Sequence, residues 1–192
     1  MSTTRPIATT RSATGIPTAR LAIWWVIASE IVIFGGLLGS YIMHRLGHPD
    51  WAGQAMHTNT WAGAFNTLVL LTSSLSAVLA HQAAERKEGV RAARFLVFTA
   101  LGGLIFLVVK AFEWTHEIQA GYTISSNTFW SFYYTAAGLH GLHVLAGMII
   151  MLIVAADARK NLELHRVEVI GLYWHFVDIV WIFLFPLLYI AK

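Results

Sequence analysis

The chain has 192 residues, of which 57% are hydrophobic and 12% are charged, and its mean hydropathy is +0.61. Soluble domains carry about 25% charged residues, so this composition favours a protein whose main solvent is a lipid bilayer. The chain has no cysteine, which excludes disulfides, thiolate metal centres, iron–sulfur clusters and thiol nucleophiles. Its formal charge of +3 is not gathered into a basic block with interleaved aromatics, so nucleic-acid binding has no support.

Residues 1–20 are predicted to form a flexible cytoplasmic arm. They are rich in Thr, Ser and Arg, contain prolines at positions 6 and 17, and have no acidic residue. Such a composition is typical of disorder. An Arg- and Ser-rich start without acids also resembles a transit peptide, although no amphipathic face is visible.

Five apolar segments follow the arm, at residues 21–44, 61–84, 94–114, 129–156 and 167–191. Each has about 20 or more residues, enough to cross ~30 Å of hydrocarbon as a helix. The sequence therefore predicts an all-α fold, an integral membrane bundle of five transmembrane helices over residues 21–192. A large soluble helical core would need polar faces that these segments lack.

The placement of Lys and Arg predicts that the N-terminus is inside and the C-terminus outside. Most basic residues fall in the arm and in the links after the second and fourth segments, whereas Arg45 and Lys192 fall on the other side. Trp51 and Trp130 are expected in an aromatic belt at the outer interface. Pro186 should bend the last segment near its outer end.

Several ionisable residues fall inside the apolar segments, where each costs roughly 2.5–3.5 kcal/mol and needs a partner or a function. Helical rise places three of them at one level near the membrane midplane. They are Glu30, His140 and Asp178. His143 and His175 form a second level nearer the inner face. We expect a hydrogen bond from Glu30 to one of the histidines.

These five residues support several interpretations. His140 and His143, three apart on one helix face, could ligate haem or copper, but a ligand set needs more converging donors. Glu30 and Asp178 could pass protons. A buried polar network that locks the helices together accounts for the pattern equally well.

Other polar and small residues are expected to serve packing. Gly35 precedes Gly39 by four positions and Gly36 precedes Ser40 by four, a spacing that allows close helix contact. Asn66 is expected to cross-link helices, and Lys110 to snorkel or to pair with Glu113.

Five stretches occur in an order that is similar to a known family. They are SEIVIFGG (29–36), FNTLVLLTSS (65–74), FEW with GYTIS (112–114 and 121–125), GLHGLHVLAG (138–147) and VEVIGLYWHFVDIVWIFLF (167–185). Together they resemble subunit III of cytochrome c oxidase and its quinol-oxidase counterparts. The resemblance covers residues 21–191.

The resemblance implies that this chain carries no haem and no copper, which sit in subunits I and II, and that no residue is catalytic or binds a metal. The residues that match the intramembrane motif are Glu30, Asn66, Glu113, His140, His143, Glu168, Trp174, His175, Asp178 and Trp181. The implied roles are packing on subunit I, binding phospholipid and sustaining proton uptake. The long form has seven spans and this chain resembles the last five, so the implied lipid contacts are in doubt. Lys110 stands where the long form usually has glutamine.

The implied function is that of a non-catalytic subunit III in a proton-pumping haem-copper oxidase of aerobic respiration. Its partners would be subunits I and II, a small subunit IV or a larger supercomplex, and membrane lipids. The short form favours the bacterial cytoplasmic membrane over the mitochondrial inner membrane. The alternatives are an accessory subunit of a nitric-oxide reductase, a free-standing proton or ion channel, and a membrane enzyme with a bis-histidine cofactor.

Overall fold

The structure is a computed structural model that describes residues 18–48 and 51–191. Its five long helices are α1 (Thr18–Gly47), α3 (Thr60–Glu85), α4 (Gly89–Gln119), α5 (Thr128–Arg159) and α6 (His165–Phe185), and η2 (Pro186–Ile190) continues the last one. All five are long and apolar enough to span a membrane. The prediction of an all-α, five-helix, multi-pass membrane protein is therefore confirmed.

Helices α1, α3, α4 and α5 begin and end one to five residues outside the predicted apolar segments, and α6 begins two residues before its predicted segment. Residues 18–20, predicted as part of the arm, form the first turn of α1, and the rest of the predicted arm lies outside the described residues. α4 extends furthest, from Gly89 to Gln119 instead of 94–114. Backbone hydrogen bonding continues past the hydrocarbon edge, so hydropathy marks only the central part of each helix.

Polar side chains cap two of the helices at the same end of the bundle. The Asn59 side chain accepts a hydrogen bond from the backbone N–H of Ala62, and the Asn127 side chain accepts one from Trp130. These oxygens satisfy donors that a helix start leaves unpaired. Between α4 and α5 the chain reverses at Gly121, whose φ of +91° favours glycine.

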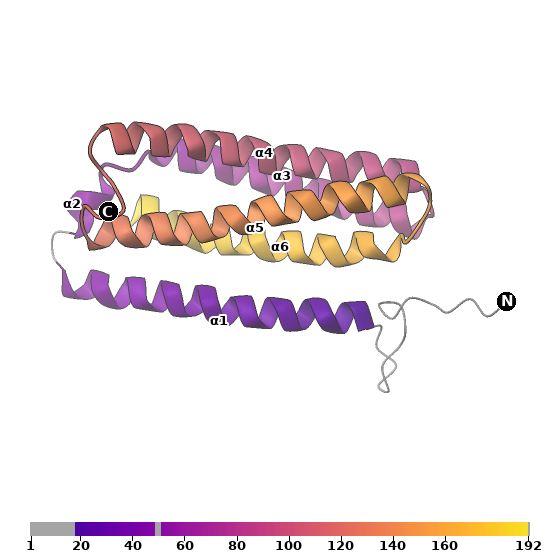
Figure 1. The fold of residues 1–192 in the computed structure, drawn as a ribbon, viewed down its shortest axis with the longest axis horizontal. Helices are drawn as coiled ribbons and strands as arrows, with labels where there is room; N and C mark the ends of the chain where they lie inside the picture. Colours follow the sequence, from indigo (N-terminus) through magenta and orange to yellow (C-terminus); the bar gives the residue numbers. More distant parts are fainter. Residues whose placement is uncertain (1–17, 49–50, 192) are drawn as a thin grey trace.

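Helices α3, α4, α5 and α6 form a four-helix group, and α1 lies along one side of it (Figure 1). α3 packs on α4 and α6, and α5 packs on α4 and α6, whereas α1 meets α6 and, less, α5. Successive long helices run in opposite directions, so α1 begins at one end of the bundle and η2 ends at the other (Figure 1). α1 is also the least buried of the five spans.

The outer surface of the bundle is apolar. Leucine, isoleucine, valine and phenylalanine side chains are exposed on all five long helices, including Val32, Leu68, Phe112, Leu142 and Phe183. An exterior of this kind suits contact with lipid tails, while the polar side chains described below lie inside.

Two expectations for single residues need correction or refinement. Trp51 and Trp130 are buried in an aromatic cluster with Phe129 rather than placed in an interfacial belt, because the short helix α2 (Trp51–Ala55) folds back over the end of the bundle. At Pro186 the α-helix gives way to the wider turn of η2, closed by a hydrogen bond from the Ala191 N–H to the Pro186 carbonyl. Proline has no N–H with which to continue the α-helical pattern.

Candidate functional site

Glu30 on α1 meets His143 on α5. Glu30 Oε2 lies 3.1 Å from His143 Nε2, and both side chains are mostly buried. The distance is that of an ion pair, but the atoms are not aligned for a hydrogen bond, so Oε2 has no hydrogen-bond partner among the described residues. The expected hydrogen bond between Glu30 and a histidine is therefore not made, and the two side chains meet at the distance of an ion pair instead.

The second ring nitrogen of His143 restricts the protonation of this pair. His143 Nδ1 lies 2.8 Å from the carbonyl oxygen of Leu139. A carbonyl only accepts hydrogen bonds, so Nδ1 carries a hydrogen and donates it. Nε2 and the Glu30 carboxyl then need one proton between them, either as imidazolium and carboxylate or as imidazole and carboxylic acid. The geometry is suited to holding one exchangeable proton.

His140 points to different neighbours from His143, although the two residues are three positions apart. Its fully buried ring stacks on Trp181 of α6 at 5.2 Å and meets the edge of Phe106 of α4 at 5.3 Å. The expectation that both histidines face one way is wrong, because three residues turn a helix by 300° and leave the side chains about 60° apart. His140 thus lies between α4 and α6, whereas His143 faces α1.

His175 and Asp178 of α6 lie against Ser74 of α3. His175 Nδ1 is 2.6 Å from the Ser74 hydroxyl oxygen. The Asp178 carboxyl is buried and lies close to the same hydroxyl, but neither of its oxygens has an aligned hydrogen-bond partner within residues 18–48 and 51–191. Glu30, His140 and Asp178 are predicted to lie at the same depth in the membrane. In the described structure, however, no hydrogen bond or ion pair joins any two of them.

Two tryptophans of α6 donate hydrogen bonds to α3. Trp174 Nε1 donates to Ser73 Oγ and Trp181 Nε1 donates to Thr67 Oγ1, both at 3.0 Å. Asn66 is fully buried and its amide donates to the carbonyl oxygen of Phe106 at 3.4 Å. These polar contacts link α3 to α4 and α6.

Glu168 lies near the beginning of α6 and pairs with α1. Its Oε1 atom is 2.6 Å from the Arg20 guanidinium, and the pair is partly exposed. This ion pair and the contact of Glu30 with His143 are polar links between α1 and the rest of the bundle.

The small residues of α1 face outward. Gly35, Gly36, Gly39 and Ser40 are exposed, and a Cβ added to any of the three glycines would meet no atom within 4 Å. The close helix contact predicted for this row is therefore not made within the described chain. By contrast, Gly102 and Gly103 of α4 are tightly packed, with neighbouring side-chain atoms 2.6 and 2.8 Å from an added Cβ.

A buried polar cluster near the end of α4 was only partly anticipated. We call it the Lys110 cluster, and its members are Lys110, Glu113, Glu117, Tyr133 and Tyr189, all of which are buried. The Lys110 ammonium contacts Glu113 Oε2 at 3.1 Å, Tyr133 Oη at 3.0 Å and Tyr189 Oη at 2.6 Å. The predicted pairing of Lys110 with Glu113 is confirmed.

Sequence reasoning missed the other members of the cluster. Lys110, Glu113 and Glu117 follow at intervals of three and four, which places them on one face of α4. That spacing was a usable signal for Glu117. The tyrosines carried no comparable signal, because they come from α5 and η2 and are brought to α4 only by packing.

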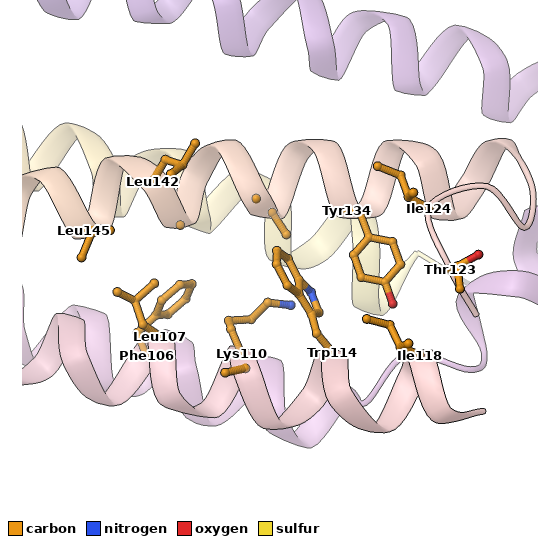
Figure 2. A pocket seen from close by; sticks show the side chains of 14 residues that line it. Phe106, Leu107, Lys110, Trp114, Ile118, Thr123, Ile124, Tyr134, Leu142 and Leu145 are labelled. Carbon is orange, nitrogen blue, oxygen red and sulfur yellow. The ribbon is translucent and has the colours of Figure 1, made fainter. Parts of the chain in front are cut away.

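A groove of about 720 Å³ runs between α4 and α5 beside the Lys110 cluster (Figure 2). Its walls are mainly apolar, and Leu142 and Ile118 at its margin are exposed. The Lys110 side chain lies on its α4 wall next to Trp114, with Tyr134 on the opposite wall (Figure 2). Within the part of the chain that the structure describes, no three His, Asp or Glu side chains are gathered to hold a metal ion.

Comparison with known proteins identifies the family of this chain. The family described as cytochrome c oxidase subunit III matches residues 9–192. A protein of Corynebacterium diphtheriae named cytochrome c oxidase subunit 3 is 34% identical over 173 residues, which cover 86% of this chain and 84% of that protein. One of the same name from Thermostichus vulcanus is 35% identical over 170 residues, which cover 85% of this chain and 83% of that protein.

A third relative is much longer than this chain. It is a protein of Aeropyrum pernix named heme-copper oxidase subunit I+III, 29% identical over 183 residues that cover 90% of this chain and 22% of that protein. The family match spans nearly the whole chain, and the five membrane-spanning helices agree with the five-span layout implied by the motifs. The chain therefore belongs to the cytochrome c oxidase subunit III family and is a haem-copper oxidase subunit III.

Proposed function

We propose that this chain is the non-catalytic third subunit of a proton-pumping terminal oxidase in a bacterial cytoplasmic membrane. It packs on subunit I, and subunits I and II hold the haem and copper that reduce oxygen. Cytochrome c is the electron donor that the relatives' names favour over a quinol. Subunit II, a small subunit IV or a larger supercomplex completes the assembly.

The observation that carries the proposal is the open face of α1. This face consists of Gly35, Gly36, Gly39 and Ser40 and has no partner within the described chain. Small residues lose packing area against fluid lipid, but they allow the backbone of a second helix to approach closely. The Aeropyrum pernix relative, named as subunit I+III, supports subunit I as the source of that helix.

Within the assembly the chain's contribution is to helix packing and to proton supply. The pair formed by Glu30 and His143 lies on the side of α1 that faces the bundle, and the open face of small residues is on the same helix. Its single shared proton gives subunit III a group that can exchange protons without a metal. The apolar groove between α4 and α5 has the size and chemistry for a lipid acyl chain.

Co-purification tests the partner. A tag on this chain should recover subunits with the absorption bands of haem, and the recovered complex should consume oxygen rather than nitric oxide. Gly35→Leu and Gly39→Leu should remove most of the haem-bearing subunits from the eluate, because each places a large side chain where the second helix approaches.

Gly47→Leu is the matched control. Gly47 lies on the same helix and an added Cβ there also meets no atom within 4 Å, but it is the last residue of α1, about two turns beyond Ser40. Its complex should be recovered in full. Full recovery with Gly35→Leu and Gly39→Leu as well would mean that this face contacts lipid, and recovery without any haem protein would defeat the proposed function.

A further inference from the structure

The Lys110 cluster contains more oxygen contacts than hydroxyl protons. Tyr133 Oη lies 3.0 Å from Glu113 Oε1, 3.0 Å from Glu117 Oε1 and 3.1 Å from Tyr189 Oη. A tyrosine hydroxyl has one proton to donate, and its oxygen accepts at most two hydrogen bonds. The contact of Tyr133 with Tyr189 needs no proton of its own, because Lys110 donates to both hydroxyl oxygens. Tyr133 has one proton for two carboxyl oxygens, so one of these two contacts lacks a proton unless a carboxyl group supplies it.

The Lys110 ammonium does not fill this gap. Its three hydrogens are matched by its three contacts, with Glu113 Oε2, Tyr133 Oη and Tyr189 Oη. It also lies over the rings of Tyr133 and Tyr189, at 4.7 and 5.4 Å from their centres. Lys110 is therefore committed to Glu113 and the tyrosines, and no contact of its ammonium reaches Glu117 among those that the structure describes.

Glu117 is the member of the cluster with an unpartnered polar atom. The residue is 3% exposed, its Oε1 meets Tyr133, and its Oε2 has no hydrogen-bond partner in the described part of the chain. With both glutamates ionised, one ammonium faces two carboxylates and the buried site carries a net negative charge. A buried charge without a partner is strongly disfavoured. One added proton makes the site neutral.

We propose that Glu113 and Glu117 share a single proton through the hydroxyl of Tyr133. In the resting arrangement the proton is on Glu117, whose O–H donates to Tyr133 Oη, and the Tyr133 hydroxyl donates to Glu113 Oε1. The contact of Lys110 with Glu113 at 3.1 Å keeps the negative charge on Glu113. The number of oxygen contacts and the charge count lead to the same protonation state.

The arrangement also defines a balanced transfer. The O–H bond of Glu117 breaks as a new O–H bond forms on Tyr133 Oη, and the original Tyr133 O–H bond breaks as one forms on Glu113 Oε1. Tyr133 is neutral before and after, one carboxylate replaces the other, and the site stays neutral. The groups facing Glu117 are Glu113 and Lys110 from α4 and Tyr133 and Tyr134 from α5, with Tyr189 of η2 behind Tyr133.

This site is separate from the pair of Glu30 and His143, because it lies near the end of α4, at the end of the bundle where α2 and η2 lie (Figure 1). It joins α4, α5 and η2, whereas the other pair joins α1 and α5. The chain thus has a second proton-holding site, on the side of the membrane where the sequence predicts the C-terminus to lie.

Infrared spectroscopy of the purified oxidase complex tests the sharing. A protonated carboxyl group gives a C=O band that carboxylates lack and that shifts in heavy water, and subtracting the spectrum of a variant complex isolates it. Glu117→Gln should abolish one such band. Glu113→Gln should abolish the same band, because the remaining Glu117 then ionises to balance the charge of Lys110 and the site stays neutral. Glu88→Gln, at an exposed side chain before α4, should change nothing.

Two further variants separate the roles within the cluster. Tyr133→Phe should keep the band but shift its frequency, because the acid loses its acceptor. Lys110→Met should give two carboxylic acid bands in place of one, because neutrality then requires both glutamates to be protonated. If Lys110→Met does not assemble, the Glu117→Gln and Glu113→Gln pair is sufficient. The proposal is wrong if neither glutamine variant removes a band, or if each removes a different one.

Discussion

At the scale of single residues, the polar side chains inside this membrane protein differ in how many hydrogen-bond or ion-pair partners they have. Glu30 and His143 share a contact at 3.1 Å, and Lys110 has three partners. Both ring nitrogens of His140 and both carboxyl oxygens of Asp178 have no hydrogen-bond partner in the described structure. Such groups are costly inside a membrane unless water, a proton or a partner subunit meets them.

Glu30 is expected to matter first for stability. Glu30→Ala leaves His143 without its partner and should lower the free energy of unfolding by about 1–3 kcal/mol. Glu30→Gln keeps the shape and the hydrogen-bonding capacity, so its stability should stay close to that of the wild type. Denaturation of the purified chain in mixed micelles measures both.

The neighbouring Ser29→Ala is the control for Glu30. Ser29 is exposed and bonds only the carbonyl of Val26 in its own helix, so its replacement should have little effect. Equal stability of Glu30→Ala and the wild type would contradict the structural role. If Glu30 also passes protons, the Glu30→Gln complex will assemble normally and lose activity sooner during sustained turnover.

At the scale of the elements, α6 is the helix around which the bundle is organised. It contacts α1, α3 and α5, and its Trp174 and Trp181 are almost completely buried. Each indole donates a hydrogen bond to a hydroxyl of α3. Lipid tails cannot compete for these hydrogen bonds, so in the membrane they help to decide which helices pair.

The hydrogen bond of Trp181 with Thr67 can be measured with a double-mutant cycle. Trp181→Phe and Thr67→Val each remove it, and the double variant should be less destabilised than the sum by about 0.5–1.5 kcal/mol. Thr72→Val is the matched control for Thr67. Thr72 is exposed and bonds the carbonyl four residues earlier, as Thr67 does, but no indole reaches it in the described structure.

Thr72→Val combined with Trp181→Phe should be additive. Additivity of Thr67→Val with Trp181→Phe would instead mean that the indole bond contributes nothing to the pairing of α3 with α6. Unfolding in mixed micelles again supplies the measurement, and the folded fraction of each variant is followed by its helical circular dichroism.

At the scale of the whole molecule, the bundle has an apolar exterior, a partly polar interior and one helix with an open face of small residues. α1 is held by the ion pair of Glu168 with Arg20 near one end and by Glu30 with His143 further along. A helix with so little burial within its own chain gains most from a partner subunit.

The separated chain is expected to bind no chromophore. The three histidines in the middle of the spans diverge, with His140 between α4 and α6, His143 facing α1 and His175 bonded to Ser74, and no cluster of three His, Asp or Glu side chains that could hold a metal ion is found among the described residues. The optical spectrum of the pure chain should lack a Soret band, and its copper content should be well below one atom per chain. A stoichiometric haem or copper would overturn this expectation, as would loss of haem from the complex on His143→Ala.

The sequence by itself determined the five helices, because hydropathy is a local property and a membrane-spanning segment needs only length and apolar side chains. The match with the family rests on local motifs in the same way. Pairs on one helix could also be predicted, and Lys110 with Glu113 is an example, since their separation depends only on helical geometry.

Only the tertiary structure decided which side chains meet across helices. Helical rise placed Glu30 at the level of His140 and Asp178, but the residue that it contacts is His143, while His140 packs against Trp181. The Lys110 cluster gathers residues from α4, α5 and η2. Depth follows from residue number alone, whereas contact also requires the rotation of each helix and the identity of its neighbours, and these are fixed by the packing of the whole bundle.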